Sequence, residues 1–265
     1  MYSWYLDAVS TNWSGLVDSN SQTIFPITFS NKLGVKQFNQ ALFTREYDVV
    51  GTGFTIDNVV DKLQKEFKNI QFRNNNVLKL NKTERVYQFI RLNEPYSCNY
   101  STNAKRLIKR SNKYYTYKVV NCIDELINLV KVNVAHKIKE FTPENINKLE
   151  VLMNNAAENN KGETIAVFEN NIIVAAGFFL KDKSRITYLK GASSNEAKKN
   201  GAMYGLMDFA FSIYDKNYKT FDFGGSNVES VATFYKKFRA KDKIYFEYSL
   251  NNLPLWFKLL KKLKI

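Results

Sequence analysis

The sequence is poor in the residues that interrupt or cross-link a chain. It has four prolines and 11 glycines in 265 residues, so we expect long regular elements joined by short loops. Two cysteines, Cys98 and Cys122, are too few for a disulfide framework or a four-cysteine zinc site, and they fit a reducing compartment. The single histidine, His136, argues against histidine-based triads and multi-histidine sites, so we expect no metal.

Long apolar runs are missing as well. No segment approaches 18 uninterrupted apolar residues, so the sequence predicts no transmembrane helix. Residues 1–7 lack a basic region followed by an apolar run, and no secretory signal is visible. We therefore expect a cytoplasmic protein.

Positive charge is abundant. Lysine and arginine number 39 against 25 acidic residues, a net charge of +14, which favours phosphates, nucleic acid or an acidic membrane surface as partners. The alternative is that much of the excess only keeps the protein in solution. Residues 253–265 place leucines and a tryptophan on one face and lysines elsewhere, which predicts an amphipathic helix. That helix either packs on the protein's own core or makes peripheral contact with an anionic membrane.

The apolar periodicity predicts an α+β fold, with an antiparallel meander followed by a crossover. Asp57 is the expected N-cap of one helix, Thr142 with Pro143 begins another, and Asn170-Asn171 suits a two-residue hairpin turn. We expect strands at residues 14–18, 22–30, 70–72, 86–90, 115–120, 164–169, 172–180, 185–190, 220–223 and 244–249, and helices at 57–68, 95–112, 122–134, 143–158, 194–215, 227–238 and 253–265.

The segment after the third strand of the meander is the first candidate ligand site. A glycine at a helix start lets backbone N–H groups approach an anion, and the helix dipole and nearby lysines favour the same charge. A pyrophosphate would fit this corner, although Ser193 with Glu196 is also typical of an ordinary capping box. The candidate residues are Gly191, Ala192, Lys198, Lys199, Asn200, Gly201, Ala202 and Met203.

The second candidate site follows the strand that ends in Asp222. Two glycines let the chain turn sharply there, and Ser226 or Asn227 can cap the next helix. Such strand ends beside a helix N-terminus are common ligand crevices. Tyr235 on that helix could donate a proton to a departing thiolate. The alternative is that the aromatic residues of this helix belong to the core.

Together these segments resemble the GNAT-fold acyltransferase domain, and most of all the FemAB-like branch, whose members carry two GNAT-like halves. The best match lies in residues 186–240, in the strings I-T-Y-L-K-G-A-S-S, K-K-N-G-A, F-D-F-G-G-S-N and F-Y-K-K-F-R-A. The first half agrees more loosely, through S-W-Y-L-D-A-V-S-T-N-W and Y-S-T-N-A-K-R. The resemblance implies tandem GNAT-like halves with mostly antiparallel central sheets, an N-terminal half at 1–120 and a catalytic half at 121–265.

The resemblance also implies a mechanism. An acyl thioester, acetyl-CoA or another acyl-CoA, would bind between two splayed central strands with its pyrophosphate on residues 198–203. An amine would attack the carbonyl and Tyr235 would protonate the thiolate, with Asp222 and Asn227 as further catalytic candidates. This sequence departs from the usual phosphate loop at Lys198 and Met203. The tyrosine position of many GNAT sequences falls one residue earlier, so Phe234 and Tyr235 both stay candidates for the general acid.

Three functions follow as expectations. The first is an acyltransferase of bacterial type, whose acceptor is an amine on a small molecule or a cell-envelope precursor. The second is a Fem-type aminoacyltransferase, which takes its acyl group from aminoacyl-tRNA and acts on a cell-wall precursor. The third is a non-catalytic module that binds RNA or an anionic surface.

Overall fold

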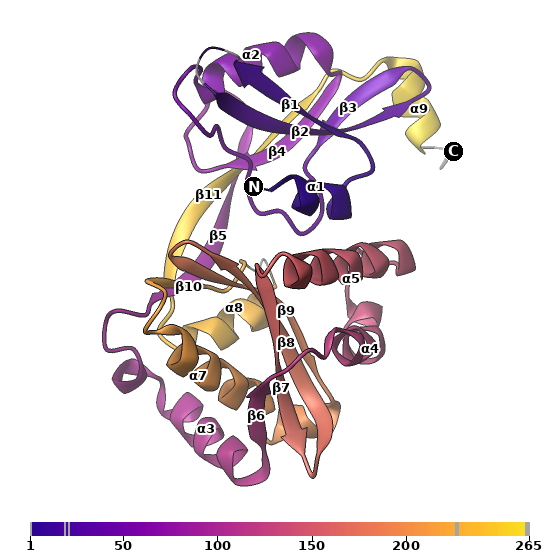
Figure 1. Cartoon of the computed structure of the whole chain (residues 1–265). Coiled ribbons are helices and arrows are strands. Elements are labelled where there is room, and N and C mark those ends of the chain that lie inside the picture. Colours follow the sequence, from indigo (N-terminus) through magenta and orange to yellow (C-terminus); the bar gives the residue numbers. More distant parts are fainter. Residues whose placement is uncertain (1, 19, 21, 226–227, 263–265) are drawn as a thin grey trace. The chain divides into compact units, whose positions relative to one another are not determined.

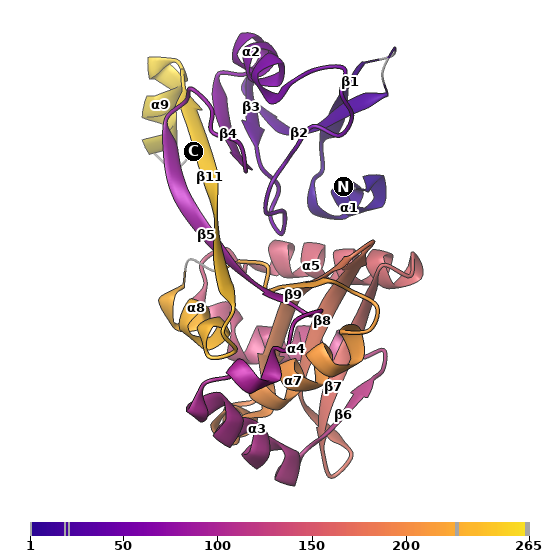
Figure 2. The same ribbon diagram turned by 90° about the vertical axis from the view of Figure 1, so that its left-hand side faces the viewer.

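The computed structural model describes residues 2–18, 20, 22–225 and 228–262, and it divides into two compact units (Figures 1 and 2). Unit 1 contains Met1–Arg85 and Ile244–Ile265, and unit 2 contains Val86–Lys243. The two long strands β5 (Lys82–Arg91) and β11 (Lys241–Asn251) have residues in both units. The boundary that the resemblance places between residues 120 and 121 separates two GNAT-like halves, which need not coincide with the two compact units. That boundary stays a prediction.

Unit 1 is a sheet in the order β1-β2-β3-β4-β11, in which β3 and β4 are parallel and the other neighbours are antiparallel. Helix α2 packs its apolar side onto large side chains of the sheet, such as Phe25, Phe38 and Phe72. The elements are α1 (Ser3–Val9), β1 (Trp13–Asp18), β2 (Thr23–Lys32), β3 (Val35–Asn39), α2 (Ile56–Glu66), β4 (Asn69–Asn74) and α9 (Leu255–Lys262), with most of β11.

The strands of unit 2 are ordered β5-β10-β9-β8-β7-β6, with β9 and β10 parallel and the other neighbours antiparallel. Helices α4 and α5 lie on one side of its strands, and α3 and α7 lie on the other (Figure 1). The elements are η1 (Ser97–Asn99), α3 (Thr102–Tyr114), β6 (Thr116–Val119), α4 (Ile123–Asn133), η2 (Ala135–Lys137), α5 (Pro143–Glu158), β7 (Gly162–Glu169), β8 (Ile172–Asp182), β9 (Arg185–Ser193), α6 (Asn195–Lys199), α7 (Ala202–Tyr214), β10 (Thr220–Asp222) and α8 (Glu229–Lys236). The predicted α+β class with mostly antiparallel strands is confirmed.

The start of α2 corrects one sequence prediction. Thr55, not Asp57, is the N-cap, because its extended backbone lets its hydroxyl accept a hydrogen bond from the Asn58 N–H at 3.3 Å. The Asn58 side chain accepts from the Thr55 N–H at 2.9 Å in return, which completes a capping box. Asp57 instead lies in the first turn, where its negative charge suits the helix dipole.

The predicted helix at 194–215 is interrupted. Gly201 has φ +83°, a left-handed conformation that ends α6 and makes this residue the N-cap of α7. Ser194 caps α6 by accepting from the Ala197 N–H at 3.1 Å. The sequence patterns also did not predict α1 or β3. Strand β3 lacks the polar–apolar alternation of a half-buried strand, because polar Gln37 is buried in it.

Candidate functional site

The turn after β10 is built around a buried carboxylate. Asp222 is inaccessible to solvent, and its Oδ1 accepts a hydrogen bond from the Gly224 N–H at 2.8 Å. Its Oδ2 lies 3.6 Å from Nη1 of Arg185 on the neighbouring strand. Gly224 has φ +77°, and a Cβ there would lie 2.8 Å from the carbonyl oxygen of Tyr188. Only glycine therefore permits this turn so close to β9.

Tyr235 lies beside this turn. It projects from α8, is only 5% exposed, and its ring stacks on that of Phe223 with 4.3 Å between centroids. Burial and the nearby charge of Asp222 raise the pKa of its hydroxyl, which therefore stays protonated at neutral pH and can serve as a proton donor. Phe234 instead packs edge-on against Tyr204 at 4.8 Å. Of the two candidates, Tyr235 is the one in contact with the aromatic residue that follows Asp222.

Strands β9 and β10 stay together for only three residue pairs. Their ladder ends at Asp222 opposite Thr187, whereas β9 continues to Ser193 in its pairing with β8. The rest of β9 therefore has no β10 partner in the part of the chain that the structure describes. The resemblance implies that two central strands diverge at such a place, and the end of this ladder lies at Asp222.

Two of the expected cofactor residues, Gly191 and Ala192, lie on the continuing part of β9. A Cβ on Gly191 would lie 2.0 Å from the hydroxyl oxygen of Tyr188, so glycine is needed to leave room for that side chain. Ala192 is buried. The structure thus places both residues at the splayed strand, and their role in binding a cofactor stays a prediction.

The expected phosphate corner is largely covered by α3. A Cβ on Gly201 would lie 2.8 Å from the carbonyl oxygen of Leu107, so this glycine is explained by the close approach of two helices. Gly201 and Ala202 are buried, whereas Met203 and Asn200 are half-buried. The close approach of α3 thus accounts for the glycine without a ligand, and binding of a pyrophosphate at the start of α7 stays a prediction.

The two lysines that precede this corner are exposed on α6. Lys199 forms an ion pair with Glu196 at 3.4 Å, and the Lys198 side chain extends into solvent. An anion could reach these side chains without reaching the covered amides. The remaining catalytic candidate, Asn227, lies outside the described residues, as does Ser226.

Unit 1 contains a pocket that no sequence pattern predicted. It has a volume of about 250 Å³, and the turn after β3 forms one wall. Gln40 holds this turn: its side-chain oxygen accepts from the Arg73 N–H, and its amide donates to the Thr44 carbonyl at 3.0 Å. The pocket is lined by Gln40, Ala41, Leu42, Phe43, Gln71, Phe72 and Arg73.

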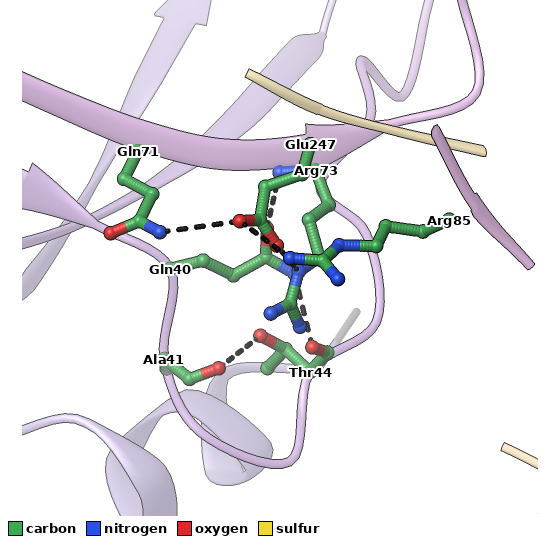
Figure 3. A network of polar contacts seen from close by, with 7 residues as sticks. All are labelled: Gln40, Ala41, Thr44, Gln71, Arg73, Arg85 and Glu247. Carbon is green, nitrogen blue, oxygen red and sulfur yellow. Dashed lines mark hydrogen bonds and ion pairs between the residues drawn. The ribbon is translucent and has the colours of Figure 1, made fainter. Parts of the chain in front are cut away.

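A charged network lies beside this pocket. Glu247 of β11 accepts from Arg73 Nε at 2.8 Å and from Arg85 Nη2 at 3.2 Å, and Figure 3 shows both guanidinium groups converging on its carboxylate. Burial opposes ionisation of Glu247, but the hydrogen bonds from the two arginines outweigh it and lower the pKa. Arg73 and Glu247 are 174 residues apart, so no local sequence pattern pointed to this pair.

The remaining sequence candidates are not brought together. Cys98 is exposed, Cys122 is buried, and both are free thiols. His136 is exposed in η2. Within the described ranges, no three histidine, cysteine, aspartate or glutamate side chains gather closely enough to hold a metal ion. Over the same residues, no helix is long and apolar enough to cross a membrane.

No protein-family model and no curated protein sequence matches the chain. Solved structures do match it. FemX superposes with a TM-score of 0.67 at 12% identity over 94% of this chain and 90% of FemX. L-PGS from Bacillus licheniformis gives 0.62 at 14% over 92% and 86%, and a tandem GNAT protein from the clavulanic acid biosynthesis pathway gives 0.50 at 6% over 88% and 79%. The expected GNAT-type, FemAB-like fold is confirmed.

Proposed function

We propose that this chain, which has the fold of FemX, L-PGS and a tandem GNAT protein, transfers an acyl group from an activated carrier to an amine. The proposed reaction takes place in unit 2. The observation that carries the proposal is the position of Tyr235, a protonated hydroxyl packed beside Asp222 where β10 has left β9.

The chemistry assigns one task to each part of this site. The amine nitrogen attacks the carbonyl carbon of the donor, and backbone N–H groups on the free side of β9 beyond Thr187 stabilise the developing oxyanion. The bond from the carbonyl carbon to the leaving oxygen or sulfur then breaks, and Tyr235 gives its proton to that atom. The proton that the amine nitrogen loses passes through water and restores the Tyr235 hydroxyl. Asp222 acts through Tyr235, because with burial it raises the pKa of the phenol, so that the Tyr235 oxygen regains its proton readily after the transfer.

Two observations support aminoacyl-tRNA as the donor. The covered amides at Gly201 and Ala202 leave little room for a diphosphate at the corner expected for coenzyme A. Helix α3, which covers them, contains no acidic residue and exposes a row of basic side chains that suits the phosphate backbone of RNA. These exposed residues are Lys105, Arg106, Lys109, Arg110 and Lys113.

An acyl-CoA donor such as acetyl-CoA is the second candidate. Its support is the exposure of Lys198 and Lys199 immediately before Gly201, where they could contact phosphates from outside the covered amides. In both cases the acceptor is an amine on a small molecule or on a cell-envelope precursor.

The test compares the two donors directly. Anisotropy of labelled tRNA, measured across a series of salt concentrations, should show binding by the native chain that weakens steeply as salt rises. The double variant Lys109→Glu, Arg110→Glu should bind more weakly and reduce the salt slope by about 2, because two phosphates are no longer neutralised. Thermal unfolding with acetyl-CoA measures the second donor, because a ligand of the folded state raises Tm.

The matched control is Lys131→Glu with Lys139→Glu, which changes the net charge equally at two other exposed lysines of unit 2. A control that loses tRNA binding as strongly as the α3 variant would assign binding to overall charge instead of α3. A Tm shift with acetyl-CoA but no tRNA binding would replace the first donor by the second. If tRNA binds but aminoacyl-tRNA transfers nothing to any amine offered, the non-catalytic module is the correct function.

A further inference from the structure

Helix α9 contacts unit 1 through Phe257. Phe257 is buried there together with Leu253 and Val35, in a small cluster separate from the main cores of the two units. Three other apolar side chains of the helix are largely exposed: Leu255 at 79%, Trp256 at 48% and Leu259 at 61%. The packing of α9 on the protein therefore uses only part of its apolar surface.

The exposed residues share one side of the helix. Leu255 and Leu259 are four residues apart and lie one above the other, and Trp256 is about 100° further round the axis. Phe257 is about 200° from Leu255, so the anchoring edge is turned away from the exposed side. The anchor thus orients α9 with its other apolar side chains toward solvent.

The turn between β2 and β3 adds a further apolar side chain in this part of unit 1. Leu33 is 69% exposed and occupies φ +50°, a conformation that a leucine adopts at some cost. It follows exposed Lys32 and stands two residues before Val35, which contacts the α9 anchor. An exposed leucine in an unfavourable conformation contributes nothing to the core. We call Leu33, Leu255, Trp256 and Leu259 the α9 surface.

The charge around the α9 surface identifies its partner. Residues 253–265 contain four lysines and no acidic residue, in a chain whose net charge is +14. Lys258 lies about 60° from Leu255 around the axis, at the border of the exposed apolar side. A helix with a lysine bordering leucine and tryptophan side chains suits the interface of a bilayer that contains anionic lipid. Tryptophan favours that depth because its ring is apolar and its N–H is polar.

We propose that the α9 surface docks onto an anionic lipid bilayer, with Leu255, Trp256 and Leu259 entering the interfacial region and lysines contacting the headgroups. This goes beyond the transfer reaction and does not depend on it, because α9 belongs to unit 1 and contains none of the residues assigned to the chemistry. It would place the enzyme beside acceptors attached to lipid.

Vesicle flotation tests the proposal without any donor or acceptor. The native chain should float with vesicles of phosphatidylcholine and phosphatidylglycerol and bind poorly to phosphatidylcholine alone. Trp256→Ser with Leu259→Ser should weaken binding to the anionic vesicles about tenfold or more, because the buried apolar area is lost. Its Tm should fall only slightly, since Leu259 is 61% exposed and Trp256 loses one edge-on ring contact, with Phe257 at 5.4 Å.

The matched control is Val132→Ser with Ile172→Ser, which removes two exposed apolar side chains from unit 2. Equal losses in the two variants, or no binding of the native chain to anionic vesicles, would overturn the proposal. So would a native dimer that the Trp256→Ser, Leu259→Ser variant converts to a monomer, if vesicles are not bound. A failure of the transfer reaction would leave the flotation result unchanged, so the two proposals fail separately.

Discussion

At the scale of single residues, Asp222 determines the geometry of the candidate active site. Its buried carboxylate accepts a hydrogen bond from the Gly224 N–H and lies 3.6 Å from Nη1 of Arg185, which fixes it at the end of β10. That charge adds to burial in raising the pKa of Tyr235. Asp222 therefore keeps a neighbouring proton in place and is a positioning residue.

Replacing Tyr235 by phenylalanine tests the proton donor. The change removes one oxygen and leaves the stacked ring on Phe223, so we expect a folded protein whose turnover falls about 10²-fold or more. The measurement is kcat and KM with whichever donor supports transfer, and the loss should fall on kcat. Tyr204→Phe on α7 is the control, because the Tyr204 ring contacts Phe234, which lies next to Tyr235 on α8. A near-normal kcat for the Tyr235 variant would reject the assignment.

Lys190 offers a second prediction at this scale. Its ammonium lies 4.1 Å from the ring centroid of Phe141, and burial lowers its pKa to about 8 from the usual 10.5. Between these values the unfolded chain binds a proton that the folded chain does not, so this residue makes stability rise with pH across that window. The rise is complete above pH 10.5, and below about pH 8 the folded chain bears the cost of a buried charge.

Lys190→Met should abolish this contribution. The measurement is urea unfolding at about pH 7 to 10. Relative to the native chain, the variant should have the higher free energy of unfolding at the low end of this range. This advantage should disappear as the pH rises, by about 1.4 kcal/mol per unit of pKa shift. Lys198→Met, at an exposed lysine, should run parallel to the native curve. Parallel curves for the Lys190 variant would contradict the prediction.

At the scale of elements, the junction of α6, α7 and α3 depends on a missing side chain. Gly201 combines φ +83° with a carbonyl oxygen 2.8 Å from the position of a Cβ, so Gly201→Ala must both strain the backbone and displace α3. Gly34 has a similar φ of +75° but nothing within 4 Å of the same position. Alanine variants at the two positions therefore distinguish the cost of backbone strain alone from the cost of strain with steric overlap.

We expect Gly34→Ala to lower the free energy of unfolding by about 1 kcal/mol, the cost of a left-handed alanine. Gly201→Ala should cost roughly 3 kcal/mol or more, because overpacking against backbone adds to that strain. Urea unfolding of both variants provides the comparison. Equal losses would mean that α3 moves away freely and that the corner beside α7 can open to a ligand.

At the scale of the whole molecule, the sequence predicted what depends on neighbouring residues and missed what depends on distant ones. Periodicity located most helices and strands, and the Asn170-Asn171 turn was correct, with φ of +49° and +66°. The reason for glycine at 201 could not be predicted, because it lies in the carbonyl of Leu107, far away along the chain. The ion pairs of Glu247 beside the unit 1 pocket were beyond local patterns for the same reason.

The way in which distant segments form unit 1 shows the same limit of prediction from local sequence patterns. Tyr248 lies in its core against Phe72, with 5.5 Å between ring centroids, and the Tyr248 hydroxyl accepts from the Leu78 N–H at 3.0 Å. Nothing local to residues 244–265 indicates that they complete a unit begun by residues 1–85.

The division of the chain into two compact units predicts that each unit unfolds cooperatively on its own. Tyr248→Ala removes a fully buried ring from the core of unit 1 and should cost about 3–5 kcal/mol there. Hydrogen exchange should then accelerate in α2 and β4, which are distant from it in sequence, while α5 and α7 keep their protection. Phe179→Ala, in the core of unit 2, should produce the reverse pattern.

Both variants remove one fully buried aromatic ring, so each is the control for the other. If either one accelerates exchange equally in α2 and α7, the two compact units unfold as one, and a ligand bound to either must stabilise both. If the patterns are reciprocal, opening of unit 1 leaves the Asp222–Tyr235 site folded, because both residues belong to unit 2. Damage to the unit 1 pocket or to the α9 surface would then be separable from damage to the chemistry.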